Sequence, residues 1–433
     1  MPGGKMTEQA SVFSKCAWRL IPFMMLLYVV NFIDRTNVGF AALTMNTDLG
    51  FSPSVFGLGA GLFFVSYILS QVPATLLLKR LGARRVIFCI MLVWGLLAAS
   101  NALIQGTRSF FALRLLLGVA EAGFFPGMIF YLTLWFPQTY RGRFTAMFSA
   151  GIPLAGVVGG PLSGVILGMD GVAGLHGWQW MFVLEGLPAA LLAFAVLRLL
   201  PDGPSQASWL THAEKDVIAA SLASDARIEG GSAWRAVGDY RLWMLAFGGA
   251  CNGCTLYGLA LWLPQVIQSL GFSNRATGFV SAAPYLAATV AMIYWGHSSD
   301  VRKDRVWHMA LALLLVTASL LAAYTTHEPL LALLALTGAT VGVYAGFGPF
   351  YSLPSSFLAG TAAAGAIAFV NSIANIGGFL GPYVFGLITE RTGEFSSSLA
   401  AFAVVEGAAA LTIVAFGTQL KRAAKEAEAV GSA

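Results

Sequence analysis

The tetrapeptide Leu49-Gly50-Phe51-Ser52 recurs 221 positions later as Leu270-Gly271-Phe272-Ser273. Three further matches keep the same offset without a gap: Asn31 with Asn252, Gly57 with Gly278, and Gly160-Pro161 with Gly381-Pro382. A single offset that holds at four places indicates an internal repeat. The sequence therefore predicts two halves of similar structure.

The composition predicts what each half contains. Hydrophobic residues make up 57% of the 433 positions and charged residues only 10%, whereas soluble proteins carry about 25% charged residues. A helix crosses a bilayer with about 20 apolar residues. Twelve segments fit: 18–43, 54–78, 86–105, 109–136, 144–168, 178–199, 239–266, 276–297, 306–324, 329–353, 362–388 and 394–418. We expect an all-α membrane protein with twelve transmembrane helices in two parallel six-helix halves.

The polar stretches set the predicted domain limits: an N-terminal half over 1–199, a linker over 200–238, a C-terminal half over 239–418 and a tail over 419–433. The linker contains the capping box Thr211-His-Ala-Glu214, which predicts a short helix. Glycines four apart at 156, 160 and 164 predict a close approach of another helix. The polar first seventeen residues do not fit a removable signal peptide.

The distribution of basic residues predicts the orientation. With the N-terminus inside, the inner loops and tails hold 20 Lys and Arg, and the outer loops hold three. This asymmetry follows the positive-inside rule and predicts that both termini are cytoplasmic. The excess of positive charge thus reflects topology and does not indicate a nucleic-acid partner.

The sequence lacks the motifs of nucleotide-driven transport and of metal binding. No phosphate-binding G-x-x-x-x-G-K-[ST] loop occurs, so we expect an ion or substrate gradient to drive any transport. Cys251 and Cys254 have metal-ligand spacing but no His or carboxylate partner nearby in sequence, and packing is the preferred interpretation. We therefore predict no metal, no cofactor and no enzymatic activity.

Four charged residues lie well inside the first and fourth predicted spans: Asp34, Arg35, Arg114 and Glu121. Such charges are costly in a bilayer, and they usually face a partner or a cavity and mark function. Arg114 and Glu121 are two helical turns apart and share one face. Asp34 and Arg35 are about 100° apart on their helix, so each needs a different partner. The alternative is a salt-bridge network that only holds the helices together.

Other polar residues in the spans extend this pattern. Tyr67, Asn371 and Asn375 lie near the predicted midplane and favour a polar cavity. Glu185 and Glu406 lie in the sixth and twelfth spans, and structural hydrogen bonding is the preferred interpretation for both.

The sequence resembles the anion:cation symporter family of the major facilitator superfamily over essentially its whole length. The resemblance rests on these motifs: Asn31-Phe-Ile-Asp34-Arg35-Thr-Asn37, Arg114-x6-Glu121, Trp135-Phe-Pro137 with Arg141-Gly-Arg143, Gly177-Trp-Gln-Trp180 with Glu185-Gly-Leu-Pro188, and Asn375-Ile-Gly-Gly378. Within that family it looks most similar to bacterial permeases for tartrate, phthalate and 4-hydroxyphenylacetate.

This resemblance implies roles for individual residues. Asp34 and Glu121 match proton-binding positions, and Arg114 matches an arginine coupled to them. Arg35 matches the arginine that holds the substrate carboxylate. Tyr67 and Asn375 match cavity residues that contact substrate, and we add Asn371 to this group. At two specificity positions, Phe32 replaces a tyrosine and Ile152 a glutamine of the sugar-acid branch, which argues against a polyhydroxylated sugar acid.

We expect a monomeric secondary transporter of the bacterial inner membrane that imports a small organic anion with protons by alternating access. The substrate would be an aromatic acid or a short hydroxy-diacid. One alternative is a proton-independent exchanger or uniporter of the same fold. Another is a membrane-embedded sensor of the same ligand.

Overall fold

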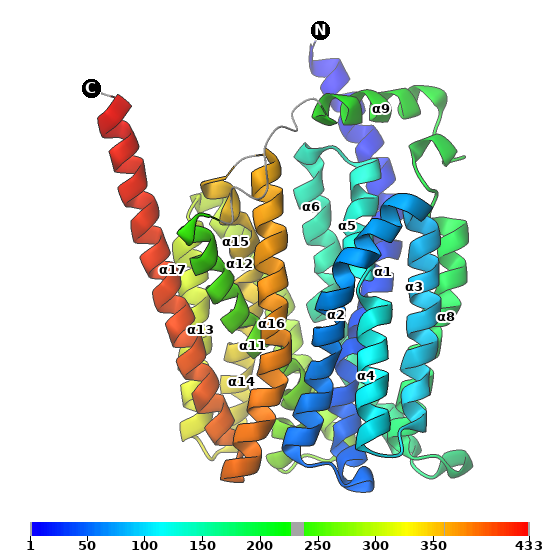
Figure 1. Cartoon of the computed structure of the whole chain (residues 1–433), viewed down its shortest axis with the longest axis vertical. Helices are drawn as coiled ribbons and strands as arrows, with labels where there is room; N and C mark the ends of the chain where they lie inside the picture. The colour runs from blue at the N-terminus through cyan, green and yellow to red at the C-terminus, as the bar shows by residue number, and fades with distance from the viewer. Residues whose placement is uncertain (1, 227–237, 359, 432–433) are drawn as a thin grey trace. The chain divides into compact units, whose positions relative to one another are not determined.

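Every regular element in the described part of the chain is a helix (Figure 1). The computed structural model describes residues 2–226, 238–358 and 360–431. The helices before residue 227 are α1 (Pro2–Leu49), α2 (Pro53–Leu81), α3 (Ala83–Ser100), η1 (Asn101–Leu103), α4 (Thr107–Glu121), α5 (Phe124–Trp135), α6 (Gln138–Ser149), α7 (Gly151–Ile166), η2 (Leu167–Met169), η3 (Val172–Gly174), α8 (Gly177–Leu199), η4 (Pro204–Gln206) and α9 (His212–Ala226). Those after residue 237 are α11 (Tyr240–Ser269), α12 (Asn274–Arg302), α13 (Arg305–Thr325), α14 (Pro329–Ala345), α15 (Phe347–Ser352), η5 (Pro354–Ser356), α16 (Gly360–Thr392) and α17 (Phe395–Gly431).

The predicted spans are confirmed. Among the described residues, twelve helical segments are long and apolar enough to cross a membrane, and their limits follow the predicted ranges. Three of these spans contain two α-helices each. The fourth breaks at Ala122-Gly123 between α4 and α5, the fifth at Ala150 between α6 and α7, and the tenth at Gly346 between α14 and α15. The sequence did not predict these breaks.

The first and last helices extend beyond the predicted spans. α1 begins at Pro2 rather than near residue 18, and α17 continues to Gly431, past the expected end at 418. The predicted capping box is present at the start of α9, because Thr211 N donates to Glu214 Oε2 over 2.8 Å and Glu214 N to Thr211 Oγ1 over 3.3 Å. Residues 227–237 of the predicted linker and 432–433 of the predicted tail lie outside the described residues.

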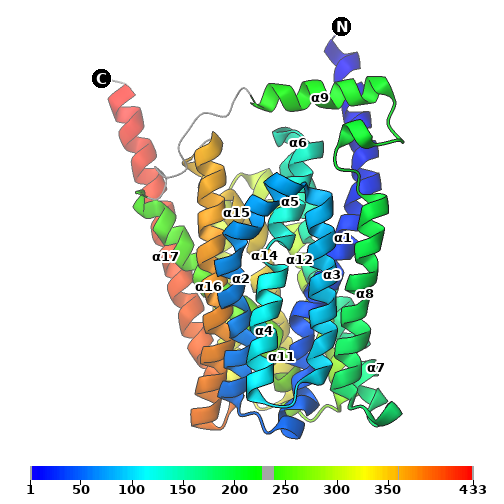
Figure 2. The same cartoon turned by 45° about the vertical axis from the view of Figure 1, so that its right-hand side comes forward.

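Helix α9 lies across the first turns of α1, as Figures 1 and 2 show. Lys15 Nζ donates to Glu214 over 2.8 Å, and this contact lowers the pKa of the Glu214 carboxyl below its ordinary value. Trp209, just before α9, stacks on Trp135 at a centroid distance of 5.6 Å. Part of the linker is thus fixed to the helices of the first half.

The described chain forms two compact units. The first comprises Met1–Asn37, Val65–Ala155 and Met169–Glu229, and the second Val38–Phe64, Gly156–Gly168 and Gly230–Ala433. In the first unit α3 packs along α8 (Figure 2). In the second unit α11 packs along α16, and α13 packs along α17 (Figure 1). The second unit therefore includes three segments, from α1, α2 and α7, that precede the linker.

Glycines explain how these segments join the second unit. A Cβ on Gly160 of α7 would lie 2.6 Å from the carbonyl oxygen of Gly278 on α12, so the two backbones are in direct contact. A Cβ on Gly57 of α2 would meet the Pro382 carbonyl on α16 in the same way. The predicted close approach of a helix at the fifth-span glycines is confirmed.

A carboxylate fixes the start of α2 within the second unit. Glu390, near the end of α16, accepts hydrogen bonds from Ser52 Oγ and from the backbone N–H of Ser54, both over 2.8 Å. An acceptor here satisfies a free N–H group and complements the positive end of the helix dipole.

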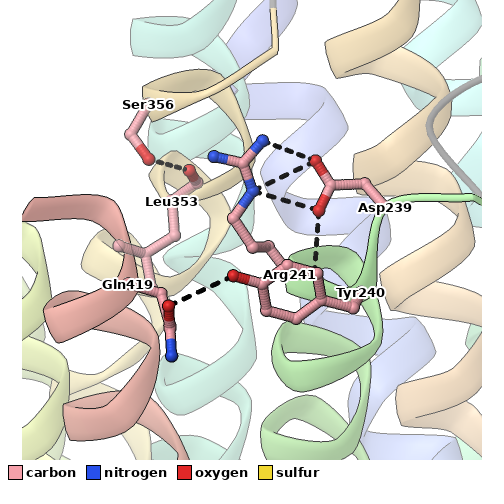
Figure 3. Close-up of polar contacts among 6 residues, drawn as sticks. All are labelled: Asp239, Tyr240, Arg241, Leu353, Ser356 and Gln419. Carbon is pink, nitrogen blue, oxygen red and sulfur yellow. Dashed lines mark hydrogen bonds and ion pairs between the residues drawn. The ribbon is translucent and has the colours of Figure 1, made fainter. Parts of the chain in front are cut away.

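The opposite end of the second unit has its own polar contacts (Figure 3). Asp239 caps α11 by accepting from Arg241 N over 2.9 Å, and it pairs with the Arg241 guanidinium at 2.7 Å. Arg241 lowers the pKa of Asp239, so this pair stabilises the fold at neutral pH and loses that effect as the pH falls through the lowered pKa. Tyr240 donates to Gln419 of α17 over 3.3 Å, and Arg241 lies over the Phe357 ring at 4.8 Å.

Large apolar side chains are exposed on many of these helices. Leu191 on α8, Ile293 on α12 and Leu411 on α17 are each more than half exposed. A soluble monomer rarely exposes so much apolar surface, whereas the hydrocarbon of a bilayer covers it.

The Gly278–Gly160 contact leads to a stability prediction. In Gly278→Ala the new Cβ would lie 2.5 Å from the Gly160 carbonyl oxygen, and α7 and α12 must separate. We expect a loss of about 1–3 kcal/mol, typical of overpacking, and a lower Tm of the detergent-purified protein by scanning fluorimetry. Gly296→Ala is the matched control on the same helix, because nothing lies within 4 Å of its Cβ. Equal Tm values for the two variants would contradict the proposed contact.

Candidate functional site

Helix α1 carries both adjacent charges of the candidate site. Asp34 and Arg35 are each 6% exposed, so neither charge is solvated. As their spacing predicts, they contact different neighbours: Arg35 pairs with α4, and Asp34 faces α3 and α8. All of these helices contribute to the first unit.

Arg35 forms a buried ion pair with Glu121, in which Nη2 donates to Oε1. Glu121 is the last residue of α4, directly before the break in the fourth span. Arg114, two turns earlier on α4, is buried and interacts electrostatically with both Glu121 and Arg35. One carboxylate thus lies between two guanidiniums.

Two aromatic rings flank the guanidinium of Arg35. Its Cζ lies 5.7 Å from the centre of the Phe32 ring and 5.2 Å from that of the Tyr67 ring. Both distances are in the range of cation–π contacts. Phe32 and Tyr67 therefore belong to the immediate surroundings of Arg35, which the sequence alone did not establish.

Asp34 has a different environment. The acids Glu185 on α8 and Glu121 on α4 lie in its surroundings. The indole N–H of Trp94 on α3 also interacts with it, although the two do not meet the distance and angle of a regular hydrogen bond. Asp34 therefore lies beside a second acid and a weakly engaged N–H donor.

Close packing of α3 and α8 supports this arrangement. A Cβ on Gly186 would lie 2.6 Å from the backbone nitrogen of Ala99, and a Cβ on Gly95 would meet the backbone of Ala190. Each glycine directly follows a residue near Asp34: Gly95 follows Trp94, and Gly186 follows Glu185. The tight helix pair holds the Trp94 and Glu185 side chains at the site.

The other predicted site residues, Ile152, Asn371 and Asn375, lie on α7 and α16. Ile152 is buried on α7 in the first unit. Asn371 and Asn375 lie one turn apart on α16 in the second unit. Tyr351 of α15 donates to Asn371 Oδ1 over 2.9 Å, and Asn375 Nδ2 donates to the Asn371 carbonyl over 3.0 Å. These bonds orient both amide side chains.

Sequence reasoning missed Glu185 and Trp94 as neighbours of Asp34. A signal was present for Glu185, because Glu185-Gly186 recurs as Glu406-Gly407 at the repeat offset of 221. Trp94 had no comparable signal. Among the described residues, no group of three His, Cys, Asp or Glu side chains could hold a metal ion.

Comparison with known proteins gives consistent results. The model of the Major Facilitator Superfamily matches residues 24–382 and, in a second match, 245–431. A protein of Agrobacterium vitis that carries the provisional name tartrate transporter is 45% identical over 394 residues, which cover 90% of this chain and 88% of that one. A quinolone resistance transporter of Acinetobacter baumannii is 39% identical over 405 residues, covering 92% and 93%.

A solved structure supports the fold. The inward-facing, unoccupied structure of a bacterial homologue of the human lysosomal transporter Spinster matches with a TM-score of 0.75, covering 94% of this chain and 97% of that one. At 19% identity, this likeness concerns the fold alone, and it confirms the fold expected from the resemblance.

The ion pair predicts unequal effects on stability. Glu121→Ala leaves the Arg35 and Arg114 guanidiniums without the carboxylate between them, and breaking a buried pair costs about 3–5 kcal/mol. Arg35→Ala leaves Glu121 with Arg114 and should cost less, although it removes the larger side chain. Tm values of the two purified variants at pH 7 test this order. A greater loss in Arg35→Ala would show that Arg114 does not balance Glu121.

Proposed function

Because the chain belongs to the Major Facilitator Superfamily, whose model covers most of its length, we propose that it imports a small organic anion together with protons. It is a multi-pass membrane transporter and not an enzyme. We further propose a bacterial inner-membrane location with both termini cytoplasmic, on the basis of the asymmetry of Lys and Arg between its loops. Transport would proceed by alternating access.

The observation that carries this proposal is the buried pair of Arg35 and Glu121. A guanidinium binds a carboxylate bidentately and with more specificity than an ammonium. In the structure the carboxylate that occupies Arg35 is that of Glu121. A substrate carboxylate would therefore compete with Glu121 for the same group.

This competition supplies a mechanism of proton coupling. Protonation of Glu121 removes its charge and frees the Arg35 guanidinium for the substrate anion. Deprotonation restores the internal pair and displaces the substrate. Proton binding to Glu121 and anion binding to Arg35 therefore favour each other, because each requires the Arg35–Glu121 ion pair to open. A proton-independent uniporter has no use for a titratable group at this position.

The surroundings of Arg35 favour carboxylates with an apolar body. The Phe32 and Tyr67 rings lie beside the guanidinium, and Ile152 adds an apolar side chain to the first unit. Burial of an aromatic ring contributes about 25 cal/mol per Å² of apolar surface. A hydroxyl buried there without a partner costs about 1–3 kcal/mol. An aromatic acid is therefore our first choice, and a short hydroxy-diacid, as the name of one relative indicates, is the second.

Neutral mimics of the two acids test the coupling. Glu121→Gln and Asp34→Asn should each abolish uptake driven by a pH gradient in proteoliposomes, since neither side chain can carry a proton. Substrate exchange, which moves no net protons, should survive in Glu121→Gln. Arg35→Lys is the control for binding, and it should lose uptake and exchange alike. Gradient-driven uptake that persists in both neutral variants would place proton coupling elsewhere.

Competition for uptake tests the substrate class. We expect phthalate or 4-hydroxyphenylacetate to compete best, tartrate next and galactonate least. A quinolone, included because of the second relative's name, tests whether a larger compound enters the site. If galactonate competed best, the interpretation of Phe32 and Ile152 would be wrong.

A further inference from the structure

A buried amide on α1 has no hydrogen-bond partner among the described residues. Asn31 is fully buried, and neither its Nδ2 nor its Oδ1 makes a hydrogen bond with them. Buried polar groups of native proteins are nearly always hydrogen-bonded, and each exception needs an explanation. A side-chain amide has two N–H donors and one oxygen acceptor. Asn31 therefore has unused capacity of both kinds.

A second buried asparagine of the first unit shows the structural alternative. Asn101, directly after α3, donates from Nδ2 to the carbonyl oxygens of Leu97 and Ala98 over 2.9 and 3.1 Å. It thus satisfies carbonyl groups at the end of a helix, which have no partner within that helix. Asn31 lies well inside α1, where the backbone groups are paired with one another. Capping of a helix end explains Asn101 and does not explain Asn31.

The spacing along α1 places Asn31 beside Arg35. Arg35 follows Asn31 by four residues, and residues at this spacing lie on one face of a helix with Cβ atoms about 5–6 Å apart. The rings of Phe32 and Tyr67 flank the same guanidinium. The amide of Asn31 is thus a neutral hydrogen-bonding group on the face of α1 that carries Arg35.

We propose that Asn31 is a further substrate-binding residue, and that it selects carboxylates with a hydroxyl on the adjacent carbon. This inference rests on the proposed function, in which Arg35 holds the substrate carboxylate. Nδ2 of Asn31 donates to a carboxylate oxygen, and the hydroxyl of the substrate donates to Oδ1. The nitrogen and the oxygen of one amide are close together, so they bind groups that are close together on the ligand. A carboxylate without this hydroxyl leaves Oδ1 without a donor.

This assignment narrows the proposed substrate class. The apolar rings near Arg35 disfavour a hydroxyl that is buried without a partner, and Asn31 supplies a partner for one hydroxyl only. An acid with a single hydroxyl next to its carboxylate therefore fits better than the same acid without it. It also fits better than a polyhydroxylated acid. The preference applies to aromatic acids and to short diacids alike.

The internal repeat provides a matched residue for comparison. At the offset of 221, Asn31 corresponds to Asn252 on α11, which is also buried and whose Oδ1 also accepts no hydrogen bond from the described residues. One turn later the second half has Leu256 where the first half has Arg35. Asn252 therefore presents a similar amide without a cation at the position that could hold a carboxylate.

Two pairs of acids that differ by one hydroxyl test the proposal: malate with succinate, and mandelate with phenylacetate. Their Kd values are measured by calorimetry at pH 7 with the purified full-length protein. We expect the wild-type protein to bind the hydroxy acid of each pair about tenfold more tightly, as one added hydrogen bond allows. In Asn31→Leu, a substitution of similar shape, the preference should disappear. Asn252→Leu is the matched control and should keep it.

Each other outcome has a definite meaning. Equal affinities within both pairs in the wild-type protein would overturn the role of Asn31, even if Asn31→Leu failed to fold. An unchanged preference in Asn31→Leu, or its loss in Asn252→Leu as well, would also overturn that role. In these cases the acids still bind, and the proposed function stands. If none of the four acids bound to the wild-type protein, the proposed function would fail together with this inference.

Thermal stability separates substrate binding from a structural role. Without ligand, Asn31→Leu removes an amide that makes no hydrogen bond with the described residues, and its Tm should equal or exceed that of the wild-type protein. Asn101→Leu loses two hydrogen bonds and should have a lower Tm. A Tm of Asn31→Leu as low as that of Asn101→Leu would assign Asn31 a structural role and overturn the proposal.

Discussion

The charge of Arg35 is the constraint on which the first unit depends. A guanidinium keeps its proton under all physiological conditions, so once α1 buries it, the surrounding helices must supply negative charge. Glu121 does so from the end of α4, and Arg114 then needs a share of the same carboxylate. In the coupling that we propose, a ligand carboxylate replaces Glu121 only when that residue is neutral. One buried charge therefore accounts for the contact between α1 and α4 and, in this proposal, for the link between proton and anion.

The positions of these groups depend on backbone contacts elsewhere. Gly95 and Gly186 bring α3 and α8 together, which fixes the positions of the neighbouring Trp94 and Glu185. Gly160 and Gly278 allow the same closeness between α7 and α12 in the second unit. Small residues serve this purpose in membrane proteins because no hydrophobic driving force pulls helices together in lipid. The charged groups can therefore be held at fixed positions even though much of the surrounding surface is apolar.

The sequence predicted the fold well because its strongest signals reflect the lipid environment and the internal repeat. Apolar runs of the length of a bilayer and an offset of 221 residues are both properties that can be counted along the chain. The charge asymmetry can also be counted, and the orientation that it indicates stays a prediction. The same signals say nothing about breaks inside a span. The end of α4 at Glu121 depends on packing and on the Ala122-Gly123 backbone, and it was missed. The site was predicted to the level of residues on one helix face, as for Arg114 and Glu121. Contacts between helices, such as Arg35 with Glu121, required the structure.

The repeat shows that a symmetric scaffold can carry an asymmetric site. At the offset of 221, Arg35 corresponds to Leu256, Arg114 to Ala335 and Glu121 to Gly342. Of the five buried Asp, Glu and Arg residues described in the first unit, only Glu185 has a charged counterpart, Glu406. The second half instead offers neutral amides at Asn371 and Asn375, which can hydrogen-bond to a ligand but cannot titrate. Most of the buried charged side chains among the described residues therefore lie in the first half. In the function that we propose, recognition of the carboxylate and exchange of the proton both depend on that half.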